Sequence, residues 1–343
     1  MTDGRTLLVR CDASVAIGTG HAMRCLALAQ AWQDAGGGAV FAIAQATPAV
    51  EDRLRRENME VVRLKADPGS ADDAQETAAL AMREHAAWVV VDGYCFGANY
   101  QATLKAAALK VLFIDDNGHA QHYSADLVLN QNAHAGERFY PSRDPSTRLL
   151  LGPRFALLRR EFIEWRGWKR EIPPLARNVL VTMGGSDPDN VTERVVQAIL
   201  GEPTLRATVV VGGSNPHLPK LRELVAGGPR DVQLMENVTN MPELMANSDV
   251  AISGAGTTSL EMCFLGLPAL LIVLASNQRP AAEELNHRGA AIHVGGSAEI
   301  QPSTLSAHLT RLVNSRDARK AISERGRELV DGRGAERVTA NLE

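Results

Sequence analysis

The sequence has few aromatic residues, few cysteines and no long apolar run, and each scarcity excludes a class of protein. Aromatic residues make up 4% of the 343 positions, too few for a surface that stacks nucleic-acid bases. The net charge of −4 and the pI near 6.2 also argue against a nucleic-acid or anionic-membrane partner. The four cysteines are scattered without a CxxC pair, as buried thiols of a reducing compartment are.

No apolar run reaches the length of a membrane span, and no signal peptide opens the chain. We therefore expect a soluble, cytoplasmic protein without a membrane partner. The apolar content of 45% and the charged content of 22% are those of an ordinary globular protein. The length is sufficient for two domains, each with its own hydrophobic core.

Short apolar runs alternate with helical patterns along both halves of the chain. Strands are expected at 6–10, 40–44, 61–64, 88–92, 111–116, 179–182, 208–211, 232–235, 250–253, 270–274 and 291–294, and a further helix at 155–165. Such alternation predicts parallel sheets covered by helices on both faces. A charged segment with two prolines, 166–176, separates the halves. We predict two Rossmann-like domains, 1–170 and 171–343, that face each other across a cleft, with the last helix packed back on the first.

A glycine turn follows the first expected strand and leads into a helix. Gly18 and Gly20 form the turn, and His21 falls in the first turn of the helix. Free N–H groups and the helix dipole at that position attract anions and disfavour an imidazolium cation. A neutral histidine can act as a general base. The alternative interpretation is a histidine that only caps the helix.

Two cofactor motifs fail on inspection. Met23 occupies the position of the third glycine in a dinucleotide fingerprint, and the loop at 184–187 lacks the Gly-Lys-Ser/Thr ending of a Walker motif. His119 and His122 follow Asp115 and Asp116 but match no structural zinc spacing. We therefore expect no metal and no cofactor.

Polar residues collect where the expected strands of the first half end. They are Asp12, Asp92, Tyr94, Asp115 and Asp116. In an open α/β sheet, ligands bind at the carboxyl ends of the strands. These side chains are therefore expected to line a ligand site.

A second glycine turn, at 253–261, has the features of a diphosphate cradle. Gly254 and Gly256 let the backbone approach a ligand, and Thr257 and Thr258 begin a helix whose N–H groups attract negative charge. Glu261 lies one helical turn further and can accept hydrogen bonds from ribose hydroxyls. The alternative is a tight strand–helix turn with a solvated glutamate.

Segment 253–278 resembles the nucleotide-sugar site of GT-B glycosyltransferases, particularly the N-acetylglucosaminyltransferase of peptidoglycan synthesis. A more specific set of motifs resembles the family of UDP-2,4-diacetamido-2,4,6-trideoxy-β-L-altropyranose hydrolases of pseudaminic acid biosynthesis. These motifs lie at 10–14, 18–29, 92–94, 114–116, 129–132, 152–159 and 182–187. The sequence departs from the family at 254–257, where Ala-Gly-Gly-Ser is expected, and at Phe155, where tyrosine is expected.

The resemblance implies hydrolysis of UDP-2,4-diacetamido-2,4,6-trideoxy-β-L-altropyranose to UDP and 2,4-diacetamido-2,4,6-trideoxy-L-altrose. In this hypothesis His21 activates a water that attacks the anomeric carbon without a metal, and Tyr94 and Asp12 line the site. The substrate-binding residues would be Gly18, Gly20, Arg24, Gly185, Ser186, Asn237, Gly254, Gly256, Thr257, Thr258, Glu261, Asn277 and Gln278. The protein is expected to be a monomer.

Two other functions stay open. One is a GT-B glycosyltransferase with a UDP-N-acetylhexosamine-type donor, which would need an acceptor pocket. The other is a non-catalytic module that binds a nucleotide sugar.

Overall fold

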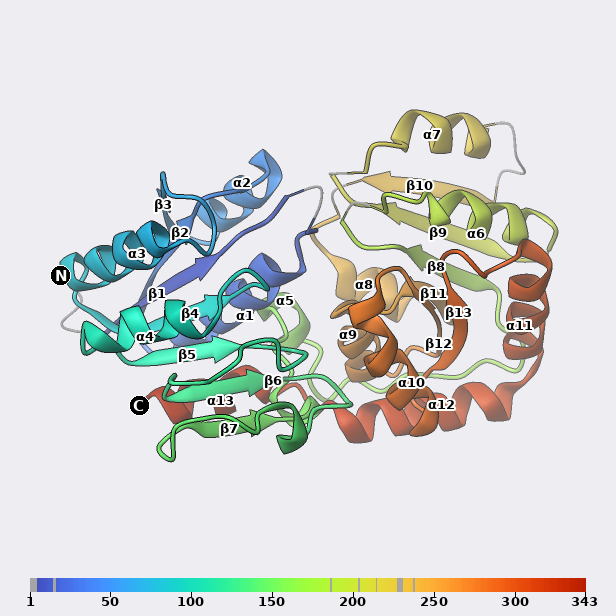
Figure 1. Ribbon diagram of the computed structural model, residues 1–343. Coiled ribbons are helices and arrows are strands. Elements are labelled where there is room, and N and C mark those ends of the chain that lie inside the picture. The colour runs from blue at the N-terminus through green and yellow to red at the C-terminus, as the bar shows by residue number, and fades with distance from the viewer. Residues whose placement is uncertain are drawn as a thin grey trace. The chain divides into compact units, whose positions relative to one another are not determined.

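The apolar runs of the sequence form two parallel sheets, one in each half of the chain. The computed structural model describes residues 5–14, 17–185, 187–202, 204–213, 215–226, 231–236 and 238–343. By its contacts the chain divides into a first unit, Met1–Arg160 with Gly332–Glu343, and a second unit, Glu161–Asp331. The division lies nearer the N-terminus than residue 170, and the last segment of the chain belongs to the first unit (Figure 1).

The sheet of the first unit has seven parallel strands in the order β3-β2-β1-β4-β5-β6-β7. In that order they span Glu60–Arg63, Gly38–Ile43, Thr6–Cys11, Ala86–Asp92, Val111–Ile114, Leu127–Asn130 and Arg148–Leu151. Residues of β1 alternate between two cores: Leu7 and Val9 belong to one, and Leu8 belongs to the other. Both faces of the sheet are therefore buried, which explains why its central strands are apolar throughout.

Helices cover both faces of this sheet. The first core contains residues of α1 (Gly20–Asp34), α2 (Pro48–Arg56) and α13 (Gly334–Leu342), and the second contains residues of α3 (Ala71–Arg83) and α4 (Ala98–Ala106). Helix α13, red in Figure 1, comes from the far end of the chain. Its Leu342 carbonyl accepts a hydrogen bond of 2.6 Å from the buried Trp88 indole.

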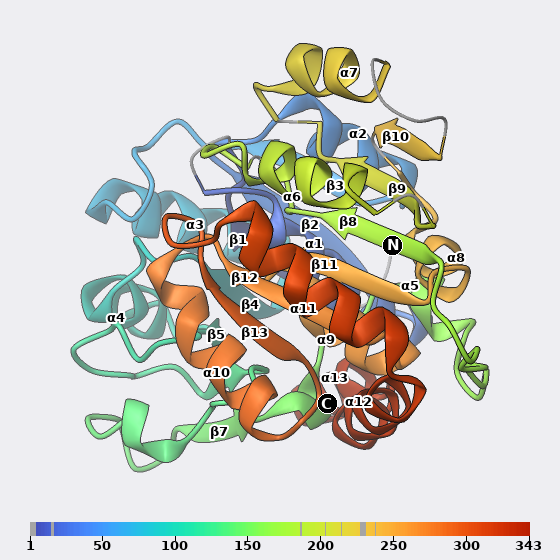
Figure 2. The same ribbon diagram turned by 90° about the vertical axis from the view of Figure 1, so that its right-hand side faces the viewer.

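The second unit repeats the architecture with six parallel strands in the order β10-β9-β8-β11-β12-β13. In that order they span Val232–Glu236, Arg206–Val211, Asn178–Thr182, Val250–Gly254, Ala269–Val273 and Ile292–Gly296. The helices are α6 (Val191–Leu200), α7 (Leu218–Ala226), α8 (Met241–Ala246), α9 (Thr258–Leu265), α10 (Arg279–His287), α11 (Pro302–Asn314) and α12 (Arg316–Leu329), with α11 in front of the sheet in Figure 2.

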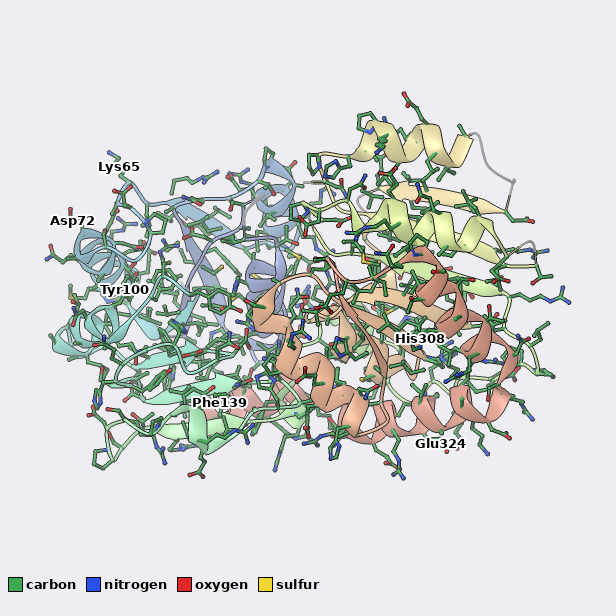
Figure 3. All side chains as sticks on the ribbon, turned by 45° about the vertical axis from the view of Figure 1, so that its right-hand side comes forward. Lys65, Asp72, Tyr100, Phe139, His308 and Glu324 are labelled. Carbon is green, nitrogen blue, oxygen red and sulfur yellow. The ribbon has the colours of Figure 1, made fainter. Side chains whose placement is uncertain are left out.

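Side chains from α6, α7 and α11 form one core with the strands of this sheet. Figure 3 shows how densely side chains fill each unit, with Tyr100 on α4 and His308 on α11 as labelled examples. Within the described ranges, none of the helices has the length and apolar character that a membrane span requires.

The prediction of a continuous helix at 155–165 is wrong. The structure has a 3-10 turn at Pro153–Phe155 and a short helix, α5, at Arg160–Ile163. Two glutamine side chains replace the missing helical bonds: Gln131 accepts from the Leu157 amide at 2.7 Å, and Gln30 accepts from the Arg160 amide at 2.8 Å. Tertiary hydrogen bonds therefore outweigh the helical pattern of this segment.

Candidate active site

The glycine turn of the first unit follows β1, the strand at which the order of the sheet reverses its direction. The chain moves outward from β1 to β2 and β3, then returns to the other side of β1 with β4. Ligands of open α/β sheets bind at the carboxyl ends of the strands at such a point. Helix α1 begins after β1 there, and β4 ends there at Asp92.

His21 and Asp92 form a hydrogen-bonded pair at this edge. Nδ1 of His21 lies 2.7 Å from Oδ1 of Asp92, and both side chains are buried. A carboxylate can only accept, so Nδ1 carries a proton, and in the neutral ring Nε2 then keeps its lone pair. No hydrogen bond to Nε2 occurs within the described part of the chain. His21 therefore has the tautomer and the orientation that a general base needs.

Arg24, one turn further along α1, binds two carboxylates. Its Nε and Nη2 each donate to Asp92 at 2.7 Å, and its Nη1 lies 2.8 Å from both oxygens of Asp116. Burial alone would raise the pKa of Asp92, but the charge of Arg24 and the hydrogen bonds from Arg24 and His21 outweigh it and hold that pKa well below its usual range. Asp92 thus stays ionised, and a carboxylate in this position can orient the ring of His21 and stabilise an imidazolium.

Tyr94 lies against the imidazole of His21. The two rings meet edge to face, with centroids 5.0 Å apart, and the Tyr94 hydroxyl donates to Asp116 at 3.2 Å. Asn132 donates to the other oxygen of Asp116 at 2.5 Å. With 42% of its surface exposed, Tyr94 is the most accessible member of this group. The structure thus brings His21, Arg24 and Tyr94 into one group of contacting side chains. The sequence predicts only that they lie near the same edge of the sheet.

Asp12 belongs to a different network. Its Oδ1 accepts from the amides of Ala44 and Gln45 at 2.8 Å, and its Oδ2 lies 2.9 Å from the guanidinium of Arg10. These contacts fix the end of β2, and a catalytic role for Asp12 stays a prediction. Direct contact of the buried Arg24 with substrate also stays a prediction.

The two glycines of the turn have separate roles. Gly18 adopts a φ of +75°, which favours glycine, and its amide donates to the Ser14 carbonyl at 2.8 Å. Gly20 is the first residue of α1. The turn therefore brings the chain from β1 into the helix that carries His21, and substrate contacts of either glycine stay predictions.

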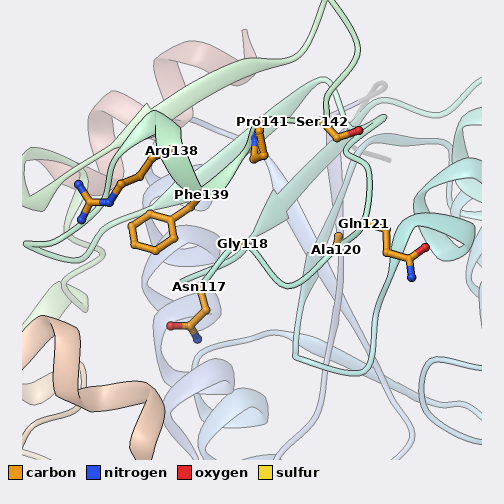
Figure 4. A pocket seen from close by; sticks show the side chains of 8 residues that line it. All are labelled: Asn117, Gly118, Ala120, Gln121, Arg138, Phe139, Pro141 and Ser142. Atoms are coloured by element: carbon orange, nitrogen blue, oxygen red, sulfur yellow. The ribbon is translucent and has the colours of Figure 1, made fainter.

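A pocket of about 280 Å³ opens in the same unit, beginning at the residue after Asp116 (Figure 4). Its lining residues are Asn117, Gly118, Ala120, Gln121, Arg138, Phe139, Pro141 and Ser142. The Arg138 guanidinium carbon lies 4.8 Å from the centre of the Phe139 ring. An aromatic ring, two amides and a cation give the pocket groups that can pack against and hydrogen-bond a polar ligand.

The second glycine turn joins β11 to α9 in the second unit. A side chain on Gly254 would come within 2.7 Å of Leu274, so only glycine fits there without displacement. Thr257 precedes the helix and Thr258 begins it, and both are partly exposed. Among the described residues, the amides of Gly256, Thr257 and Thr258 donate to no backbone carbonyl. This is the arrangement of free N–H groups that binds phosphate.

The other predicted residues of the second unit lie near this turn or beyond the described residues. Glu261 is in the first turn of α9, and Gln278 accepts from the Leu274 amide at 3.0 Å. A Cβ on Gly256 would lie 3.8 Å from the Gln278 side chain, which brings the two segments together. Asn277 is in a 3-10 turn, Ser276–Gln278, beside it. The carbonyl of Gly185 packs against Gly212 of the next loop. Ser186 and Asn237 lie outside the described residues.

Asp92 and Asp116 were expected at the ligand edge of the sheet, but the sequence did not predict their contacts with His21 and Arg24. Asp92 ends β4 and Asp116 lies two residues after β5, so their position at the sheet edge could be predicted. Their pairing with His21 and Arg24 depends on which strand lies beside β1, and a single sequence does not state that order.

Solved structures match the chain over nearly its whole length, and two of them serve as examples. MurG of Acinetobacter baumannii has a TM-score of 0.65 at 17% identity, covering 98% of this chain and 99% of that one. The spinosyn rhamnosyltransferase SpnG, complexed with thymidine diphosphate, has a TM-score of 0.69 at 16% identity, covering 99% and 100%. The fold is that of GT-B glycosyltransferases. This confirms the GT-B-like fold class with two parallel-sheet Rossmann-like units.

The second unit also matches a family model. Residues 178–332 match the glycosyltransferase family 28 C-terminal domain. The matched segment contains both β11 and α9, and therefore the second glycine turn.

Curated relatives match parts of the chain at lower coverage. The spore coat polysaccharide biosynthesis protein SpsG of Bacillus subtilis is 29% identical over 236 residues, 68% of each chain. A Helicobacter pylori protein named pseudaminic acid cytidylyltransferase and UDP-2,4-diacetamido-2,4,6-trideoxy-β-L-altropyranose hydrolase is 26% identical over 59% of this chain, but over only 37% of its own length. The relationship to a hydrolase thus rests on part of a longer protein, and the match to SpsG is more extensive.

Proposed function

We propose that this chain breaks the sugar–phosphate bond of a nucleotide sugar and transfers the glycosyl group to a hydroxyl acceptor. The donor would be a UDP-N-acetylhexosamine-type sugar. The observation that carries the proposal is the His21–Asp92 pair, with Nδ1 held at 2.7 Å by a buried carboxylate. The match of residues 178–332 to the family 28 C-terminal domain supports it, as does a solved GT-B structure with bound thymidine diphosphate.

The chemistry follows from these groups. Nε2 of His21 takes the proton of the acceptor hydroxyl as its oxygen attacks the anomeric carbon, and Asp92 stabilises the resulting imidazolium. The bond from that carbon to the phosphate oxygen breaks, and UDP leaves with the electron pair. We assign UDP to the turn before α9, where amides and the helix dipole stabilise the departing diphosphate. Glu261 would accept hydrogen bonds from the ribose.

The pocket that begins at Asn117 supports a hydroxyl acceptor. A water molecule needs no pocket, whereas a saccharide needs an apolar surface for its ring and polar groups for its hydroxyls. Phe139 supplies the first, and Asn117, Gln121 and Arg138 supply the second. We therefore assign the acceptor to this pocket.

Hydrolysis of UDP-2,4-diacetamido-2,4,6-trideoxy-β-L-altropyranose is the second candidate. The similarity to the Helicobacter pylori protein favours it, together with the Gly-x-Gly-His turn before α1. Water would replace the acceptor hydroxyl, and the products would be UDP and the free sugar. The bonds made and broken at the anomeric carbon are otherwise the same.

One experiment tests both candidates. The protein is incubated with UDP-N-acetylglucosamine and with the UDP-diacetamido sugar, each with and without a panel of saccharide acceptors, and released UDP and sugar products are measured. Transfer predicts UDP release that depends on an acceptor and falls in Phe139→Ala. Release without acceptor, with the free sugar as product, would establish hydrolysis instead.

Isotopic water separates the possible hydrolytic mechanisms. In ¹⁸O-labelled water, attack at the anomeric carbon places the label in the sugar, and attack at phosphorus places it in UDP. Label in UDP would contradict the role given to His21. No UDP release from any donor would contradict both candidate functions.

A further inference from the structure

The buried group of side chains around His21 holds more negative than positive charge. Its members are His21, Arg24, Asp92 and Asp116. Arg24 contacts the other three: Nη1 lies 2.8 Å from both oxygens of Asp116, and Nη2 lies 2.7 Å from Asp92 and 3.2 Å from Nδ1 of His21. Two carboxylates thus share one guanidinium. With a neutral imidazole, the group keeps one negative charge that no member balances.

The contacts of Asp116 fit an ionised carboxyl group. Among the described residues, each hydrogen bond to its two oxygens comes from a donor. Arg24 reaches both oxygens, Asn132 donates to Oδ1 at 2.5 Å, and the Tyr94 hydroxyl donates to Oδ2 at 3.2 Å. A protonated carboxyl group would have to direct its own hydrogen at one of these donors. Asp116 therefore contributes a full negative charge beside Arg24.

Other titratable side chains surround this group without supplying the missing positive charge. They are Tyr94, Cys25, Tyr140, His119 and His134. Burial raises the pKa values of the Cys25 thiol and the Tyr140 phenol, so both stay neutral. His119 lies 3.0 Å from Asp115, so a charge on His119 is matched by that carboxylate. His134 donates from Nε2 to the backbone carbonyl of Asp116 at 3.2 Å, a contact that a neutral ring makes.

A proton on His21 removes this imbalance, because the imidazolium brings the charge of the buried group to zero. Unbalanced charge costs far more in a protein interior than in water. If Arg24 faced Asp92 alone, the pair would be neutral and would attract a proton on His21 only weakly. We propose that Asp116, acting through Arg24, keeps the group negative and so strengthens His21 as a proton acceptor.

Asp116 is in this sense a positioning residue, which places charge beside the base without touching the reacting atoms. Its effect on turnover rests on the function proposed above, in which His21 is the base. Its effect on the proton affinity of His21 does not rest on that function. The two effects are therefore measured separately.

The test uses Asp116→Asn, with Asn132→Ala as the matched control. Asp116→Asn keeps the shape of the side chain and removes its charge, and the Tyr94 hydroxyl can accept a hydrogen bond from the new amide. Asn132→Ala removes one donor from the same carboxylate and leaves its charge in place. A role in packing would respond to both variants, whereas a role of the charge responds to Asp116→Asn.

The first readout is proton uptake by His21. Its imidazole Cε1–H signal is followed by NMR against pH in the full chain. The titration midpoint should lie about one pH unit lower in Asp116→Asn than in the parent, a tenfold loss of proton affinity, and Asn132→Ala should not lower it. An unchanged midpoint in a folded Asp116→Asn overturns the proposal. In the parent, the ¹³C signal of the Asp116 carboxyl group should be that of a carboxylate wherever His21 titrates. A protonated Asp116 in that interval overturns the proposal whether or not any variant folds.

The second readout is turnover. The acidic fall of kcat should move to lower pH by the same interval in Asp116→Asn, and kcat above it should drop by up to about tenfold, because a weaker base takes the proton less readily. KM for the donor, which we assign to the second unit, should change little. If the midpoint of His21 falls and the acidic fall of kcat does not move, the effect of Asp116 stands and His21 is not the base. If no donor is turned over, the proposed function fails and the NMR midpoint alone decides the role of Asp116.

Discussion

The base of the proposed mechanism needs both an available lone pair and a fixed orientation, and two residues would supply these. His21 supplies the lone pair at Nε2, and Asp92 fixes the ring through Nδ1. The charge of Asp92 is in turn balanced by Arg24, whose guanidinium also binds Asp116. Buried charges are tolerated only when they are paired in this way, so removing one member should destabilise the others.

Replacement of His21 by asparagine tests the base with little disturbance of this network. Asp92 keeps its two bonds to Arg24 in His21→Asn, so the variant should fold like the parent. Loss of a general base lowers turnover by roughly 10²–10⁴-fold. The UDP dissociation constant, measured by calorimetry, should be nearly unchanged. Near-full turnover in a folded variant would transfer the role of base to another group.

Glu261 is tested through nucleotide binding. If its carboxylate accepts the ribose hydroxyls, Glu261→Ala should raise the UDP dissociation constant about ten- to a hundredfold, the effect of a charge-assisted hydrogen bond worth roughly 1.5–3 kcal/mol. The matched control is Glu324→Ala on α12 of the same unit, an exposed glutamate labelled in Figure 3. Equal UDP affinity in Glu261→Ala and the parent would remove Glu261 from the nucleotide site.

At the scale of whole elements, α13 completes the first unit. Its Ala335, Val338 and Leu342 belong to the core that α1 forms with the sheet, and Trp88 of β4 donates to its last turn. The start of α13 packs against Ala156, where a glycine, Gly334, leaves room for the backbone. The helix is therefore a structural part of this unit.

Truncation of one α13 side chain should measure that contribution. Leu342 is 3% exposed, so Leu342→Ala should lower the free energy of unfolding by about 2–5 kcal/mol in urea titrations. The control Ala340→Ser changes an exposed position of the same helix and should stay within about 0.5 kcal/mol of the parent. If both variants unfold like the parent, α13 does not stabilise the unit.

The elements differ in how far local sequence could predict them. Helix α1 follows a glycine turn and an uninterrupted apolar pattern, so the placement of His21 in its first turn could be predicted. The segment 155–165 has a helical pattern too, yet its amides bind Gln131 and Gln30, which lie far away in sequence. Likewise, the strand ends at which Asp92 and Asp116 lie could be predicted, but the side chains that they contact could not. Local sequence patterns therefore predict a helix such as α1, whereas hydrogen bonds between residues distant in sequence determine the structure of a segment such as 155–165.

Across the molecule, buried carboxylates concentrate in the first unit. Burial would raise the pKa values of Asp73, Asp92 and Asp115, yet paired cations and hydrogen-bond donors lower all three below their usual range. A folded-state pKa below the unfolded value of about 3.9 contributes stability above that pH, and the contribution is lost as the pH falls through the folded-state pKa. His119 has the opposite sign, because its pKa is raised.

The stability of the first unit should therefore fall on both sides of a weakly acidic to neutral optimum. We expect the urea midpoint to fall steadily between about pH 5 and pH 2 as these aspartates take up protons, and more gently above about pH 6.5 as His119 loses its proton. Circular dichroism at a series of pH values measures both limbs. His119→Gln should remove the alkaline limb and keep the acidic one. A midpoint that is constant from pH 5 to pH 2 would contradict the pairing of these carboxylates.

The return of α13 to the first unit has a consequence for synthesis on the ribosome. The first unit is interrupted by the whole of the second, since its core takes residues from Met1–Arg160 and from Gly332–Glu343. The second unit is continuous and can fold as soon as it emerges, whereas the first must wait until Gly332–Glu343 has been made. Until then the apolar face of α1 stays uncovered, so the nascent first unit should depend on chaperones more than the second.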